Sequence, residues 1–131
     1  MKGIADTGFV VAFLNRRDAH HAWACALAET VEVPLLTVEA VLAEASFQVQ
    51  STAAVVRLIG AGLLAVDFTL NENLERIEKL AHRYKDRSPD LADLCLICLS
   101  ERHPRRPVLT VDGDFLVYRR QQREVIPVIM P

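Results

Sequence analysis

The sequence has no continuous apolar run of the roughly eighteen residues that a membrane-spanning helix requires. Its first segment, MKGIADTGFVVAFLNRR, holds a short apolar stretch, but Asp6 interrupts that stretch and no small-residue cleavage site follows it. We therefore expect this segment to be part of the fold rather than a signal peptide. We also expect a protein that does not contact a membrane.

Cysteine is scarce, with three residues in 131, and an odd number of cysteines cannot all pair within one chain. Without a secretory signal, this favours a reducing compartment, so we expect a cytoplasmic protein. The formal net charge of −2 lacks the overall basic character of many nucleic-acid binders, although local basic patches remain compatible with it. A hydrophobic fraction of 51% excludes a disordered chain, and the length of 131 residues predicts one domain over residues 1–131.

Short apolar runs rich in β-branched residues alternate with longer segments of helical periodicity. Strands are expected at residues 2–5, 34–37, 63–68, 107–111 and 125–130. Helices are expected at residues 7–16, 18–30, 38–49, 52–62 and 71–86, and within 87–102. Near-continuous apolar strands that alternate with helices indicate an α/β fold, in which helices cover both faces of a parallel sheet.

Polar residues at the starts of three helices are expected to serve as N-caps. Asp18 precedes the helix at 18–30 and Thr37 precedes the helix at 38–49. In the segment RSPDLADLCLICLSER, Ser88 is a suitable N-cap and Pro89 a favoured first helical residue. Each of these residues has a side chain or ring suited to a helix N-terminus.

Several acidic residues are expected at one edge of the sheet. Asp6 directly follows the first strand, and Asp112 directly follows VLTV. Asp90 and Asp93 lie in the first turns of a helix that begins at the same edge. The carboxyl ends of parallel strands form the functional crevice of open α/β sheets, so we expect these carboxylates to converge.

The two aspartates of RSPDLADLCLICLSER differ in how easily a helix explains them. Asp90 complements the helix dipole in the first turn and needs no further reason. Asp93 lies deeper in a helix that is apolar on nearly every side, which is typical of a buried helix. A buried carboxylate requires a partner, which can be an arginine, backbone amides or a metal ion.

The other acids each have an ordinary explanation when taken singly. Glu44 flanks an apolar helical stripe, as a solvated edge residue would, and Asp6 is a suitable N-cap for the next helix. Asp112 and Asp114 surround Gly113 in a typical turn sequence. Their convergence favours a second interpretation, because clustered carboxylates need a compensating cation. An all-oxygen ligand set suits Mg²⁺ or Mn²⁺, which supports phosphodiester hydrolysis.

Four segments, IADTGFVVAFLN, LLTVEAVLAEASF, SPDLADLCLICLSER and VLTVDGDF, resemble in their order and spacing the PIN-domain ribonuclease family, and within it the VapC-type toxins of toxin–antitoxin pairs. The resemblance covers nearly the whole chain. It implies a three-layer α/β/α sandwich with a mostly parallel central sheet. It also implies Mg²⁺- or Mn²⁺-dependent cleavage of single-stranded or loop RNA, a small cognate antitoxin and a homodimer.

The resemblance also assigns roles to individual residues. It implies a catalytic quartet of Asp6, Glu44, Asp93 and Asp112, in which Asp6 and Asp93 are the principal metal ligands. Glu44 would help to hold the metal or orient water. Supporting roles are implied for the hydroxyl of Thr7, for Asp90, and for Asp114, which competes with Asp112 as the fourth acid.

Two further groups of residues have competing interpretations. Arg105 and Arg106 belong to an arginine-rich part of the chain, which is either ordinary solvated surface or a phosphate-binding rim for RNA around the acidic centre. Cys95 and Cys98 have the spacing of metal ligands, but on an apolar helix they are typical of core packing.

Other functions remain open at this level. A haloacid-dehalogenase-type hydrolase also begins from a strand-end aspartate but needs a second aspartate where this chain has Gly8. A receiver-like signalling module needs a late lysine, and no lysine follows Lys85. An RNA-processing nuclease without an antitoxin and a non-catalytic partner-binding domain are the remaining alternatives.

Overall fold

A computed structural model describes residues 1–121 and 123–131. Its central sheet has five parallel strands in the order β3-β2-β1-β4-β7. The strands are β1 (Ile4–Ala5), β2 (Leu35–Thr37), β3 (Leu64–Val66), β4 (Val108–Leu109) and β7 (Val128–Ile129). Ile4 of β1 lies opposite both Leu36 and Val108, so β1 is the middle of the sheet. The expectation of an α/β fold with a largely parallel sheet is confirmed.

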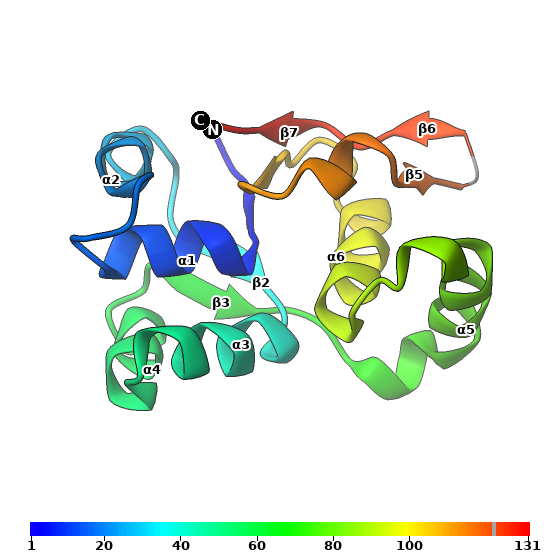
Figure 1. Cartoon of the computed structure of the whole chain (residues 1–131), viewed down its shortest axis with the longest axis horizontal. Coiled ribbons are helices and arrows are strands. Elements are labelled where there is room, and N and C mark those ends of the chain that lie inside the picture. The colour runs from blue at the N-terminus through cyan, green and yellow to red at the C-terminus, as the bar shows by residue number, and fades with distance from the viewer. Residues whose placement is uncertain (122) are drawn as a thin grey trace.

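Helices cover the sheet to give a three-layer α/β/α sandwich (Figure 1). The α-helices are α1 (Thr7–Leu14), α2 (His21–Ala28), α3 (Glu39–Val49), α4 (Thr52–Gly60), α5 (Leu74–Arg83) and α6 (Leu91–Arg102). Short 3-10 helices are η1 (Leu70–Asn73), η2 (Lys85–Arg87) and η3 (Gly113–Leu116). Among the described residues, no helix is both long enough and apolar enough to cross a membrane.

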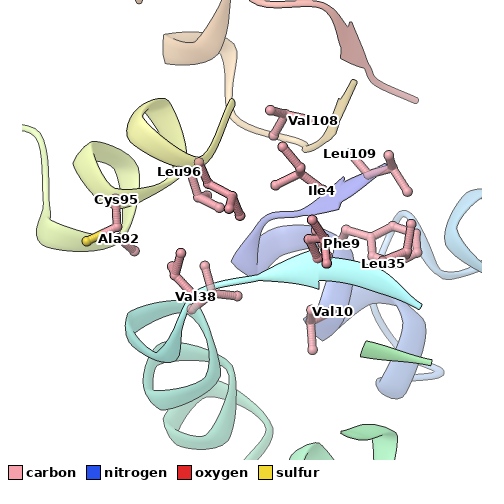
Figure 2. Packing of buried hydrophobic residues seen from close by; sticks show 14 of the residues in the cluster. Ile4, Phe9, Val10, Leu35, Val38, Ala92, Cys95, Leu96, Val108 and Leu109 are labelled. Carbon is pink, nitrogen blue, oxygen red and sulfur yellow. The ribbon is translucent and has the colours of Figure 1, made fainter. Parts of the chain in front are cut away.

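Helix α6 runs through the interior of the protein. Nine consecutive residues, Ala92 to Ser100, are buried, as expected for a helix that is apolar all round. Figure 2 shows Leu96 of α6 pointing toward Ile4 of β1, while Phe9 of α1 lies near Leu35 of β2. Because Asp93 belongs to this buried stretch, the fold carries a carboxylate into the core at the N-terminal end of α6.

The structure corrects all three expected N-caps. Asp90, not Ser88, is the N-cap of α6, and its side chain accepts a hydrogen bond from the Asp93 amide. Ser88 adopts a left-handed backbone conformation with φ of 47°, which is incompatible with an N-cap. The Thr37 hydroxyl donates instead to the Ala5 carbonyl, and Asp18 accepts from the His20 amide in a turn before α2.

Two expected elements are divided in the structure. The segment 125–130 contains the end of β6 (Glu124–Val125), which pairs antiparallel with β5 (Arg119–Arg120), and then β7. Pro127 separates the two strands, since it has no amide hydrogen to donate. The expected helix at 71–86 is α5 with η1 before it and the start of η2 after it.

Candidate metal centre

Asp6 is held at the carboxyl end of β1 by two hydrogen bonds. It is the N-cap of α1, and its Oδ1 accepts from the Thr7 amide at 2.7 Å. Its Oδ2 accepts from the Thr110 hydroxyl at 2.6 Å, and Asp6 is only 5% exposed. The ordinary capping role of Asp6 is therefore present, but its other oxygen is also fixed by Thr110, the residue that directly follows β4.

Gly8 allows α1 to approach the segment that follows β4. A Cβ at Gly8 would overlap the side chain of Val111, and no such atom can be accommodated without displacement. Val111 directly precedes Asp112. Glycine at position 8 therefore permits the close approach that brings Asp6 and Asp112 to one pocket.

Asp93 is buried in the first turn of α6. It is 7% exposed, and its Oδ2 accepts a 2.9 Å hydrogen bond from the Tyr118 hydroxyl. Its own backbone amide donates to Oδ1 of Asp90 at 2.8 Å, which is the capping bond of the helix. The sequence therefore correctly indicated a buried Asp93 that needs a partner, and Tyr118 supplies one hydrogen-bond donor.

Asp112 and Asp114 lie at the start of η3. Asp112 is the N-cap, and its Oδ1 accepts from the Asp114 amide at 2.8 Å. The Asp112 amide in turn donates to the Thr110 hydroxyl at 2.9 Å. Asp114 forms an ion pair of 2.9 Å with Arg87 across the surface. Thr110 thus connects Asp6 and Asp112 through one hydroxyl.

The carboxylates form two overlapping groups. Oxygen atoms of Asp93, Asp112 and Asp114 all lie within 4.8 Å of one another, a spacing suitable for one metal ion. An open pocket is lined by acidic and neutral residues from several elements: Asp6, Thr7, Gly8, Glu44, Gln48, Asp90, Asp93, Val111 and Asp112. Asp93 and Asp112 belong to both groups, so they occupy the centre of the acidic cluster.

Glu44 reaches the same pocket from α3. The Thr7 hydroxyl donates to Oε1 of Glu44 at 3.1 Å, and this bond connects the start of α1 to the middle of α3. Gln48, one helical turn after Glu44, lines the pocket as well. The structure therefore brings together every acid of the expected quartet, although Asp6 and Glu44 are outside the tightest triad.

Burial disfavours the ionised form of three acids of the site, Asp6, Glu44 and Asp93. Burial and, after it, the negative charge of Asp90 together raise the pKa of Asp93 to about 8, against the opposing hydrogen bond from Tyr118. Burial also raises the pKa of Asp6 to about 6, although the bonds from Thr110 and Thr7 oppose this. The pKa of Glu44 is raised by burial and then by Asp90. A cation at this position would reverse these shifts.

The donor set fits a hard divalent cation. All the clustered side chains offer oxygen, as Mg²⁺ and Mn²⁺ prefer. Among the described residues, no thiol or imidazole joins such a cluster. Cys95 and Cys98 are buried free thiols in the core, as the packing interpretation expected, and burial raises their pKa values to about 11 and about 12.

Thr110, Gln48, Tyr118 and Arg87 are site residues that the sequence did not identify. Helical periodicity could have found Gln48, because residues four apart share a helix face. Thr110 is two residues before Asp112, so alternation along the strand could have placed it near the site. Tyr118 reaches Asp93 only through the tertiary fold, and no local pattern signals that contact.

Arg105 and Arg106 do not border the acidic pocket. They lie in the turn between α6 and β4. This turn leads into the start of β4, whereas Asp112 follows the end of β4, so the two lie at opposite edges of the sheet. About nine residues of α6 separate Asp93 from Arg102, which corresponds to roughly 14 Å of helix. Arg87 is an arginine whose side chain does pair with an acid of the triad, Asp114.

No protein-family model matches the chain, and a search of curated proteins finds no match either. The function must therefore be argued from the residues of the site.

Proposed function

We propose that this chain is an Mg²⁺- or Mn²⁺-dependent endoribonuclease that hydrolyses phosphodiester bonds in single-stranded or loop RNA. The observation that carries this proposal is the convergence of Asp93, Asp112 and Asp114, whose oxygens lie within 4.8 Å, at a pocket also lined by Asp6 and Glu44. These acids come from four separate parts of the sequence. Hard divalent cations are best suited to compensate the negative charge of such a cluster.

The residues of the site divide into those that would bind the metal ion and one that would accept a proton. Asp93 and Asp112 would hold the metal, with Asp114 and Asp6 completing its surroundings. When bound, the cation supplies positive charge that polarises the phosphodiester and acidifies water. Glu44, whose pKa is raised by burial, is suited to accept a proton from the attacking water. Tyr118 and Thr110 orient Asp93 and Asp6 through their hydroxyl groups.

The biological setting of the proposal comes from the resemblance to VapC-type toxins. On that basis the chain is a cytoplasmic toxin that forms a homodimer and is neutralised by a small cognate antitoxin. Growth arrest on expression of the wild type, relieved by the product of a small upstream reading frame, would support this setting. Robust growth together with RNA cleavage in vitro would favour an RNA-processing nuclease without an antitoxin.

Asp93→Asn is the sharpest test of the active site. The asparagine side-chain oxygen can still accept the hydrogen bond from Tyr118, so the fold is expected to persist while the charge is lost. Cleavage of mixed structured RNAs in Mg²⁺ or Mn²⁺ should fall by at least about a hundred-fold, on the order of 2.7 kcal/mol. Mn²⁺ binding, followed by calorimetry, should weaken in parallel.

Asp18→Asn is a matched control, because the Asp18 carboxylate accepts from the His20 amide in a nearby turn and is not among the residues that line the pocket. It should cleave as the wild type does. Equal cleavage by wild type and Asp93→Asn, or wild-type cleavage that survives removal of metal by EDTA, would contradict the proposal. Intact Mn²⁺ binding without cleavage of any RNA would favour the non-catalytic, partner-binding alternative.

A further inference from the structure

A second polar concavity lies at the far end of α6 from the acidic cluster. We call it the basic pocket, and it is lined by Met1, Lys2, Arg102, His103, Pro104, Arg105 and Arg106. Figure 1 shows the turn toward β4 at the C-terminal end of α6, whereas Asp93 lies in the first turn of that helix. No acidic side chain is among the residues that line the basic pocket. Its positive charge is therefore not neutralised from within.

Two arginines of this turn, Arg105 and Arg106, contribute to the positive charge of the basic pocket. Nη1 of Arg106 is buried and has no hydrogen-bond partner, which is costly for a charged guanidinium. Across the residues that the structure describes, neither Arg105 nor Lys2 forms an ion pair. His103 pairs with Asp67 at 3.2 Å, and Arg102 donates to the Asp67 carbonyl at 3.3 Å. Asp67 is not among the residues that line the pocket, so its carboxylate offsets positive charge next to His103 and Arg102 rather than next to Arg105 and Arg106.

The turn that carries these arginines is firmly anchored. The Arg106 amide donates to the His103 carbonyl at 3.0 Å, which closes the turn. The buried guanidinium of Arg120 donates to the Pro104 carbonyl at 3.0 Å. The Ile4 amide donates to the Pro107 carbonyl at 2.9 Å, which fixes the segment after Lys2 against the turn. The backbone that carries these cationic side chains is therefore held in place before any ligand arrives.

The dipole of α6 accounts for only part of this arrangement. Cations in the last helical turn are stabilised by the partial negative charge of the unpaired carbonyls, and Arg102 is in that turn. Arg105 and Arg106 lie beyond the helix, where the effect falls off rapidly. Gathering several like charges in one concavity costs free energy unless an anion binds there.

We propose that the basic pocket is a phosphate-binding site, which holds phosphoryl oxygens through Arg105 and Arg106 with Lys2 as a further cation. The planar, forked donors of arginine match the oxygens of a phosphate group. The shared chemistry is a phosphoryl group, carried either by a small phosphate compound or by the backbone of a single-stranded polynucleotide. The site is separate from the acidic cluster and does not depend on the proposed RNA cleavage.

Calorimetry on the full chain in EDTA would test the site without contributions from divalent metal. The two probes are inorganic pyrophosphate and a single-stranded RNA decamer without terminal phosphates. Binding should weaken at least ten-fold in the double variant Arg105→Ala, Arg106→Ala. The matched control is Arg16→Ala, Arg17→Ala, which removes the same charge from exposed residues outside the pocket and should stay within about two-fold of wild type.

Arg105 is exposed, so the single substitution Arg105→Glu is expected to preserve the fold and can replace the double variant if that variant folds poorly. It should reduce binding of the same probe at least ten-fold, and amide signals of the 103–106 turn should shift on titration of the wild type. Binding of pyrophosphate alone assigns a small phosphate compound, and binding of the decamer, weakened by salt, assigns a polynucleotide backbone. Failure of both probes to saturate the wild type, or equal losses in the two double variants, would overturn the site.

Discussion

Tyr118 donates a 2.9 Å hydrogen bond to Oδ2 of Asp93, which lies 25 residues earlier in the chain. The ring of Tyr118 is fully buried and packs edge-on against Tyr84 and Phe115. Burial raises the pKa of Tyr118, and the charge of Asp93 raises it further, so the phenol remains a neutral donor. One oxygen of Asp93 is thus fixed by a group that favours its ionised form.

Tyr118→Phe should therefore weaken the metal centre with little change in packing. Loss of a hydrogen bond to a charged group costs roughly 1.5–3 kcal/mol, so Mn²⁺ affinity should fall about ten-fold or more near neutral pH. The pKa of Asp93 should also rise above about 8, because this bond lowers it. Calorimetry and carboxyl NMR titration would measure the two effects. Tyr84→Phe is the control, since the Tyr84 hydroxyl accepts from the Arg119 amide and touches no carboxylate of the site; matching losses in both variants would refute the assigned role.

Thr110→Val should uncouple Asp6 from Asp112 while preserving side-chain shape. The missing hydroxyl would no longer donate to Asp6 or accept from the Asp112 amide, so the pKa of Asp6 should rise above its value of about 6. Carboxyl NMR titration would detect this rise. Thr37→Val is matched, because Thr37 is equally buried but its hydroxyl donates to the Ala5 carbonyl. A pKa of Asp6 that stays unchanged in Thr110→Val would count against the coupling.

The stability of the metal-free protein should fall as pH rises. Burial raises the folded-state pKa values of Asp6 and Asp93 to about 6 and about 8, above the ordinary value of 3.8. The contribution of these two protonated carboxyls to the free energy of unfolding is therefore fully present below the unfolded-state pKa of about 4. It is lost as pH rises through the two folded-state pKa values. In EDTA, Tm should drop by roughly 5–10 °C between about pH 5 and about pH 9.

Asp93→Asn should flatten this decline, since the group with the higher pKa no longer ionises. Saturating Mn²⁺ should restore most of the wild-type Tm at high pH, because a ligand of the folded state stabilises it. Thermal melts with and without metal would measure both effects. A metal-free wild-type Tm that rises over the same pH range would refute the interpretation.

Arg120 should be essential for the stability of the C-terminal region. It is 4% exposed and donates to the carbonyls of Ser100 and Pro104, both at 3.0 Å, while its Nη2 pairs with Glu124. Arg120→Ala leaves buried carbonyls without donors and should lower the free energy of unfolding by about 3 kcal/mol. Urea denaturation would measure the loss. Arg123→Ala, at an exposed position, should change stability by less than about 0.5 kcal/mol, and a comparable effect there would contradict the prediction.

The sequence alone determined the strands of the parallel sheet and the edge at which the acids gather, but not the pairing of β5 with β6. Alternation of apolar strands with helices fixed the parallel sheet, and parallel strands end at a common edge, so Asp6 and Asp112 had to lie near each other. The apolar surroundings of Asp93 in its own helix indicated that it is buried. These features are encoded locally, because periodicity reports which face of an element is covered.

Only the tertiary structure decided how the acids are held and where the cations lie. The hydroxyls of Thr110 and Tyr118 reach Asp6 and Asp93 across large separations in sequence, through packing that no local pattern records. The choice of Asp90 over Ser88 as N-cap depends on the backbone path before α6. Asp93 lies in the first turn of α6, and Arg105 and Arg106 come after its last turn. The length of α6 therefore places these arginines at the opposite edge of the sheet from the acidic pocket.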